Sequence, residues 1–111
     1  MQKLRYHWMI ASVMLMILCA CEKIPQLDAL APGATVLAFG DSVTYGVGAN
    51  SGEDFPSLLA GETGWNVINA GVSGDTAREA KHRIGALLAQ HKPQLVIVEL
   101  GGNDFLRRRS M

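Results

Sequence analysis

Residues 39–46 read FGDSVTYG, and the expected fold is built outward from this stretch. Residues 35–39 form a compact apolar run of strand type, with turn-forming residues on both sides. A serine that follows such a strand, as Ser42 does, projects from the carboxyl edge of a sheet, where ligands of open α/β folds bind. Gly-Asp-Ser is also an ordinary turn sequence, because all three residue types favour turns. The rest of the chain decides between these two interpretations.

Local signals predict an alternation of strands and helices after this first strand. Pro56 suits the first turn of a helix, Thr76 and Glu79 have the spacing of a capping box, and Pro93 ends a helix. The expected elements are a helix from about residue 54 to 61–64, a strand at 65–70, a helix from 77 to about 91 and a strand at 95–100. The glycine-rich segment 40–52 is expected to be a loop.

The order strand, helix, strand, helix, strand predicts parallel pairing, because both crossovers are long enough for it. The fold class is therefore α/β: a three-layer α/β/α, flavodoxin-like parallel sheet. With three strands it is incomplete, the first half of a doubly wound domain.

Apolar residues at helical spacing predict which faces are buried. The first helix is expected to bury Phe55, Leu58 and Leu59, and the second to bury Ala77, Ala80, Ile84, Leu87 and Leu88. The strand at 95–100 is the most apolar, which is typical of a strand covered on both faces, and only Glu99 interrupts it. One edge of this strand is expected to be unpaired.

Two further loops follow strands and therefore open on the same edge as Ser42. Residues 71–75 (GVSGD) offer backbone N–H groups close to a ligand and lead into a helix N-terminus. Residues 101–104 (GGND) offer a side-chain amide. A serine that cleaves esters needs such donors for the oxyanion of its tetrahedral intermediate. Each loop taken alone is also a common strand-to-helix turn or helix cap.

Taken together, Gly40-Asp41-Ser42, NAGVSGDT at 69–76 and GGND at 101–104 resemble the first three sequence blocks of the SGNH hydrolases, or GDSL esterases. The resemblance extends over residues 36–107. It is closest to the bacterial branch of thioesterases, lysophospholipases and arylesterases. It implies a serine esterase or thioesterase that hydrolyses acyl esters through an acyl-enzyme, with no metal or cofactor.

The resemblance also implies roles for individual residues. Ser42 corresponds to the nucleophile. Its backbone N–H, the N–H of Gly74 and the side chain of Asn103 correspond to the oxyanion hole. Asp41 and Asp104 correspond to residues that hold the loops rather than take part in the chemistry.

The fourth block of the family, an Asp-x-x-His pair that supplies the catalytic base, is not found before the last residue, Met111. His7 belongs to the amino-terminal leader, His82 is expected to be a solvated helix residue, and His91 falls at the helix end away from Ser42. We therefore expect residues 35–111 to be a truncated SGNH hydrolase domain. The alternative is a catalytically inactive, lipid-anchored fragment or acyl-binding module.

The first 20 residues have the pattern of a signal peptide. Lys3 and Arg5 precede an apolar stretch at 8–18, which is shorter than the roughly 20 residues of a membrane span. Residues 18–21 (LCAC) resemble the lipobox of bacterial lipoproteins, which implies acylation of Cys21. We expect a signal peptide at 1–20, a tether at 21–34 and an exported protein anchored to a bacterial membrane, facing the periplasm or cell surface. A plain secreted protein and a retained transmembrane helix are the alternatives.

Composition excludes several other classes. Ten basic and ten acidic residues balance, and no basic stripe suggests nucleic acid as a partner. Both cysteines lie near the amino terminus, so neither a disulfide framework nor a structural zinc site is expected. The pair Gly46 and Gly48 suggests a nucleotide-binding domain, but Ser51 stands where a third glycine is needed. The expected partners are a small acyl ester or thioester and, through Cys21, a membrane.

Overall fold

The computed structural model describes residues 1, 7 and 28–108. Apart from Met1 and His7, the expected signal peptide lies outside the described residues, as do Cys21 and the first part of the tether. The elements are β1 (Thr35–Gly40), α2 (Ser42–Tyr45), α3 (Phe55–Thr63), β2 (Asn66–Gly71), α4 (Ala77–His91), β3 (Leu95–Glu99) and α5 (Gly102–Leu106). The predicted order of strands and helices is confirmed, with α2 and α5 as additions.

The three strands form one parallel sheet in the order β2-β1-β3. Gly40, the last residue of β1, pairs with Gly71 on one side and with Glu99 on the other. The three carboxyl ends therefore lie at the same level of the sheet. The chain reverses its direction of winding between β1 and β3, and in doubly wound folds such a switch point marks the binding crevice.

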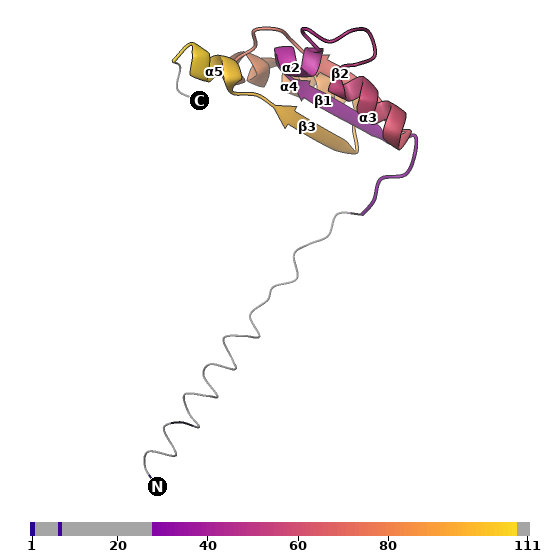
Figure 1. Ribbon diagram of the computed structural model, residues 1–111, viewed down its shortest axis with the longest axis vertical. Helices are drawn as coiled ribbons and strands as arrows, with labels where there is room; N and C mark the ends of the chain where they lie inside the picture. Colours follow the sequence, from indigo (N-terminus) through magenta and orange to yellow (C-terminus); the bar gives the residue numbers. More distant parts are fainter. Residues whose placement is uncertain (2–6, 8–27, 109–111) are drawn as a thin grey trace.

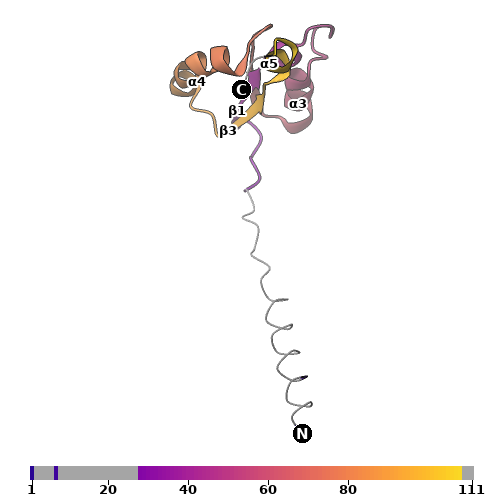
Figure 2. The same ribbon diagram turned by 90° about the vertical axis from the view of Figure 1, so that its left-hand side faces the viewer.

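Helices cover both faces of this sheet, as the three-layer prediction requires. Figure 2 shows α4 on one side of β1 and β3 and α3 on the other, and Figure 1 shows α2 and α5 near the arrowheads of the strands. The edge of β3 away from β1 has no partner strand in the described chain.

The core lies around β1, the central strand. Leu37 and Phe39 pack against Ala80 of α4, with Ile84 and Leu87 of the same helix beside them. Val36 and Ala38, which alternate with them along the strand, point to the opposite face and are fully buried. A strand covered on both faces by helices is expected to be an apolar run, and residues 36–39 of β1 meet this expectation.

Side-chain caps fix where the two long helices begin. The Thr76 hydroxyl accepts a hydrogen bond from the Glu79 amide, and the Glu79 carboxylate accepts one from the Thr76 amide, so the predicted capping box is confirmed. At α3, the Asp54 carboxylate accepts bonds from the hydroxyl and the amide of Ser57. These bonds, the hydroxyl first, lower the pKa of Asp54.

Several sequence-based expectations about burial are wrong. Leu58 and Leu88 are 53% and 40% exposed, and on α3 the buried residue is Pro56. Val98 is 63% exposed, so β3 is not covered on both faces. The reason is position: β3 is an edge strand, and α4 packs mainly over β1.

Two boundaries also differ. The second strand runs over Asn66–Gly71 rather than 65–70, and the third ends at Glu99 rather than at residue 100. Part of the expected 40–52 loop is the short helix α2, whose first turn is capped by Asp41. An aspartate that follows a strand is a turn former and an N-cap residue alike, so its neighbours decide the outcome.

The contrast between Leu37 and Leu58 is directly testable. Replacing Leu37 with alanine should lower the free energy of unfolding by about 2–5 kcal/mol, because a fully buried leucine leaves a cavity. Leu58→Ala, the matched control on an exposed position, should change it by less than about 0.5 kcal/mol. Urea denaturation of both variants measures the difference. Equal losses would contradict the assignment of the core to β1.

Candidate active site

The short helix α2 lies directly on the carboxyl ends of β1 and β2. A Cβ atom on Gly40 would meet the Thr44 hydroxyl and the Glu99 carbonyl oxygen, and one on Gly71 would meet the backbone of Tyr45. Glycine is required at both strand ends because any side chain there would push α2 away. This close approach places Ser42, the first residue of α2, next to the end of the central strand.

A buried polar pair joins α2 to the third strand. The Thr44 side chain is fully buried, and its hydroxyl donates a 3.1 Å hydrogen bond to Oε2 of Glu99, the last residue of β3. This bond explains why a carboxylate interrupts the apolar run at 95–100. A buried hydroxyl without a partner would be costly, so the pair holds α2 against β3.

The three loops that follow the strands meet through Asn103. Its Nδ2 atom donates to Oδ2 of Asp41 at 3.2 Å and to the backbone oxygen of Asp75 at 2.9 Å. Asp41 lies in the β1–α2 connection, Asp75 in the β2–α4 connection, and Asn103 in α5 after β3. The expectation that all three loops share one sheet edge is confirmed by these bonds and by the strand register.

Two buried aspartates bind backbone amides at this edge. Asp41 is 3% exposed, and its Oδ1 accepts from the Val43 amide at 3.0 Å, which caps α2. Asp104 is 1% exposed, and its Oδ2 accepts from the Ala77 amide at 2.8 Å at the start of α4. Asp41 therefore caps its own helix, α2, and Asp104 ties α5 to the N-terminus of α4, where negative charge is favoured.

Ser42 begins the helix α2, and Gly74 lies in the turn that connects β2 to α4. Ser42 is half-buried in the first turn of α2. Gly74 has φ +86°, in the tight turn in which the Asp75 amide donates to the Val72 carbonyl at 3.1 Å. A positive φ at this position favours glycine over every other residue.

The two histidines of α4 do not complete a triad at this edge. His82 is exposed on α4, and His91 lies in its last turn, just before the chain returns to the start of β3. Among residues 1, 7 and 28–108, no group of three or more His, Cys, Asp or Glu side chains is arranged to hold a metal ion.

Sequence reasoning missed two residues at this edge, Glu99 and Arg83. The signal for Arg83 was present: it follows Ala80 by three residues and precedes Leu87 by four, so it shares the buried face of α4. An arginine on such a face needs buried acceptors, and here it forms a 2.7 Å ion pair with Asp75.

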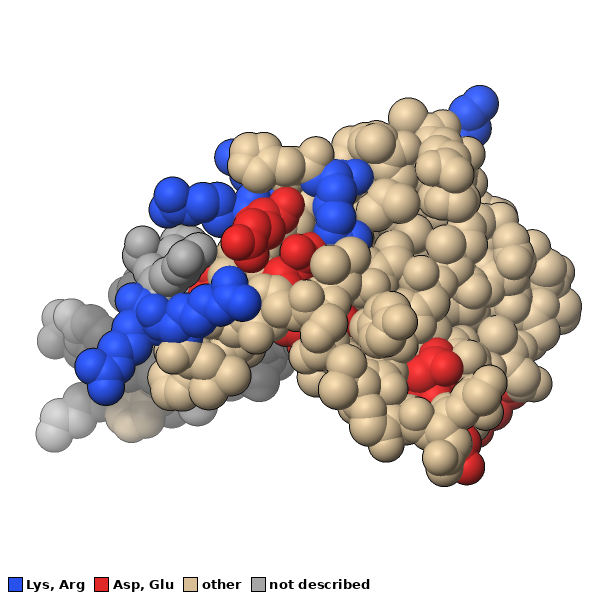
Figure 3. Space-filling view, turned by 90° about the horizontal axis from the view of Figure 1, so that it is seen from above, with Lys and Arg blue, Asp and Glu red and all other residues tan. Residues whose placement is uncertain are grey.

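Charged side chains concentrate at the same end of the molecule. Figure 3 shows Lys and Arg side chains around acidic ones at the end that holds α5. At this end Arg83 forms an ion pair with Asp75, and Arg107 lies 3.8 Å from the Glu79 carboxylate. The second pair is about half exposed and contributes little to stability.

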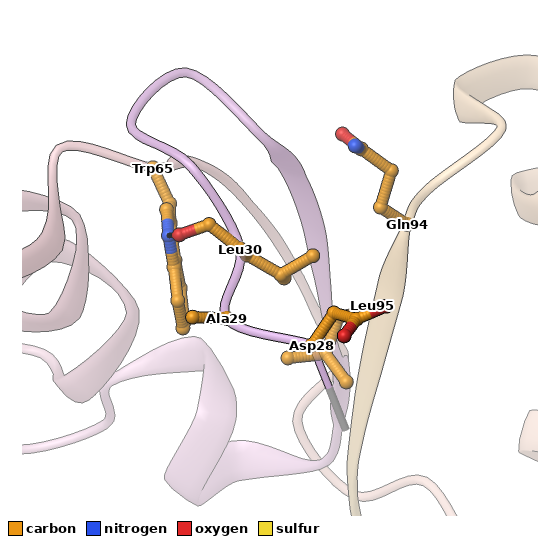
Figure 4. Close-up of a pocket in the computed structure, with 6 residues that line it drawn as sticks. All are labelled: Asp28, Ala29, Leu30, Trp65, Gln94 and Leu95. Carbon is orange, nitrogen blue, oxygen red and sulfur yellow. Dashed lines mark hydrogen bonds between the residues drawn. The ribbon is translucent and has the colours of Figure 1, made fainter. Parts of the chain in front are cut away.

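A cavity of about 350 Å³ lies at the opposite edge, near the amino ends of β2 and β3 (Figure 4). It is lined by Asp28, Ala29, Leu30, Trp65, Gln94 and Leu95. Two of its polar atoms already bind the backbone: the Trp65 indole donates to the Leu30 oxygen, and Oε1 of Gln94 accepts from the Thr35 amide. The cavity is therefore separate from the Ser42 edge.

No helix in the described part of the chain has the length and hydropathy to cross a membrane.

Comparison with known proteins identifies the class to which this fold and these loops belong. Residues 38–111 match the model of the GDSL-like lipase/acylhydrolase family, and the chain belongs to this family of carboxylic ester hydrolases. The match covers all three loops, β2, β3 and the carboxyl half of β1. The predicted family resemblance is confirmed.

Individual relatives agree with this assignment. The chain is 38% identical over 97 residues to "Esterase TesA" of Pseudomonas aeruginosa, covering 83% of this chain and 48% of that protein. It is 44% identical over 75 residues to "Thioesterase 1/protease 1/lysophospholipase L1" of Escherichia coli K12, covering 66% and 36%. The crystal structure of AlinE4, an SGNH-hydrolase family esterase, superposes with a TM-score of 0.65 at 42% identity, covering 74% of this chain and 47% of that one. The chain thus spans about half the length, or less, of these relatives.

The contact between α2 and the strand ends gives a stability prediction. Gly71→Ala should lower the free energy of unfolding by about 1–3 kcal/mol, because its methyl group collides with the backbone of Tyr45. Gly85→Ala, the control on α4, meets no atom within 4 Å and should raise the free energy of unfolding by about 0.5–1 kcal/mol. Denaturant titration of both variants measures these changes. A neutral Gly71→Ala would show that α2 does not rest on β2.

Proposed function

We propose that this protein is a serine esterase or thioesterase in which Ser42 is the nucleophile and Gly74 and Asn103 supply oxyanion donors. The observation that supports this most directly is the pair of bonds from Asn103 Nδ2 to Asp41 and to Asp75. Asp41 precedes Ser42 and Asp75 follows Gly74, so one side chain brings all three candidate residues to a single edge. Membership of the acylhydrolase family gives the reaction class.

The proposed chemistry is acyl transfer in two stages. The Ser42 oxygen attacks the acyl carbonyl carbon, and the tetrahedral intermediate collapses with loss of the alcohol or thiol. Water then attacks the acyl-enzyme, releases the acid and restores Ser42. The amides of Ser42 and Gly74 and the side-chain amide of Asn103 would stabilise the negative oxygen in both stages.

Asn103 has to exchange one partner to fulfil this role. Its Nδ2 atom carries two hydrogens, and both are engaged in this structure. The 3.2 Å bond to Asp41 is the longer of the two, and it is the one that we expect an acyl oxygen to replace. The 2.9 Å bond to the Asp75 oxygen would then keep the amide aimed at the site.

The reaction requires a base that takes the proton of Ser42, and a chain without such a base would be inactive. His82 is exposed and His91 lies in the last turn of α4, so neither is proposed as the base. The family resemblance implies an Asp-x-x-His pair for this step. If no base acts in this chain, the second candidate function is a catalytically inactive module that binds acyl groups at the same edge.

The substrate class follows from the names of the relatives. They include an esterase, a thioesterase and lysophospholipase, and an arylesterase from Vibrio mimicus. We therefore propose a small acyl ester or thioester as the substrate.

A covalent probe separates the two candidate functions. A fluorophosphonate should label Ser42 in the 111-residue chain, and Ser42→Ala should abolish the label, whereas Ser51→Ala on an exposed loop should keep it. Asn103→Ala should slow labelling about 10²- to 10³-fold through loss of an oxyanion donor. Asn66→Ala, an exposed asparagine on β2, is its control. Absence of labelling in a chain shown to be folded would favour the inactive module.

We further propose that Cys21 is acylated and anchors the protein to a membrane. Residues 18–21 (LCAC) support this proposal, and more than one acyl chain gives stable attachment. In a bacterial host fed a labelled fatty acid, the protein should incorporate the label, and Cys21→Ser should lose it. Cys19→Ser is the matched control and should retain it. Incorporation into Cys21→Ser would end the lipoprotein proposal.

A further inference from the structure

The Arg83 side chain is bound by three acceptors from three positions of the chain. Its Nε donates to Oδ2 of Asp75 at 2.7 Å, its Nη1 to the Ala70 oxygen at 2.7 Å and its Nη2 to the Gly40 oxygen at 2.8 Å. The guanidinium also lies 4.3 Å from the centre of the Phe39 ring. Its side chain is 24% exposed, so these charge-assisted bonds are partly shielded from water.

These acceptors are the ends of the two strands that flank the proposed site. Gly40 is the last residue of β1, and Ser42 follows two positions later. Ala70 is the penultimate residue of β2, and Asp75 is the last residue of the turn that contains Gly74. One rigid planar group therefore spans the gap between the segment of the proposed nucleophile and the segment of a proposed oxyanion donor.

Only arginine has the geometry for this arrangement. Its planar fork presents several N–H donors at fixed angles, whereas a lysine ammonium is a point charge on a flexible stem. A lysine at position 83 could keep the ion pair with Asp75 but could not also bind two carbonyl oxygens in one plane. The Phe39 ring below the guanidinium limits its rotation further.

We propose that Arg83 is a positioning residue that sets the distance between the Ser42 segment and the Gly74 turn. This inference rests on the proposed function, because it concerns the same site. Arg83 touches neither Ser42 nor the acyl group in this scheme and acts through Gly40 and Asp75. A displacement of about 1 Å at a reacting centre can cost on the order of 10²-fold in rate, so a loosened turn should slow the acylation of Ser42.

The test compares Arg83→Lys with Arg78→Lys, an exposed arginine on the same helix. Two quantities are measured on the full chain: the rate of fluorophosphonate labelling of Ser42, and amide hydrogen exchange in residues 72–75 and 36–38. In Arg83→Lys, labelling should slow about 10- to 100-fold, and exchange in 72–75 should rise about tenfold while 36–38 change less than about twofold. Arg78→Lys should match the wild type in both measurements.

Two results would overturn the proposal. One is labelling and turn exchange in Arg83→Lys that stay within about twofold of wild type. The other is exchange that rises by the same factor in 36–38 as in 72–75, because Arg83 would then stabilise the whole sheet rather than the turn. If the wild type fails to label, the hydrolase function is lost, and the exchange comparison alone decides whether Arg83 fixes the turn.

Discussion

The structure depends on the contact between α2 and the ends of β1 and β2. This contact exists because Gly40 and Gly71 carry no side chain, so the backbone of Thr44 and Tyr45 lies directly on the sheet. The register of the strands sets the two glycines side by side, one from each strand. A side chain at either position would push α2 away from the sheet edge and would therefore displace Ser42.

Buried polar bonds then hold the connections around α2. Thr44 binds Glu99, Asp41 binds Asn103, and Asp104 binds the start of α4. In the described residues every buried side-chain nitrogen and oxygen has a hydrogen-bond partner. A fully satisfied network of this kind makes an edge rigid, because breaking any bond leaves a buried polar group without a partner. The proposed acyl-transfer site would require such rigidity, because oxyanion donors have to be in position before charge develops.

The fold places this network at the position where doubly wound sheets bind ligands. The strand order β2-β1-β3 puts the switch in winding direction between β1 and β3. Ser42 follows the first of these strands, and Asn103 follows the second. The cavity at the amino edge is lined mostly by apolar groups, and two of its polar side chains, Trp65 and Gln94, already bind the backbone.

The sequence by itself determined the α/β class, the order of the long elements, the Thr76 capping box and the shared edge of the three loops. These features follow from local rules: apolar periodicity, cap residues, and the parallel pairing that long crossovers impose. Only the tertiary structure decided that Leu58, Leu88 and Val98 are exposed, because burial depends on which neighbours cover a face. It also decided that Glu99 accepts a hydrogen bond from Thr44 and that Arg83 donates to Gly40, Ala70 and Asp75. These partners lie 8 to 55 residues away in the chain, and no local pattern specifies a bond across such a separation.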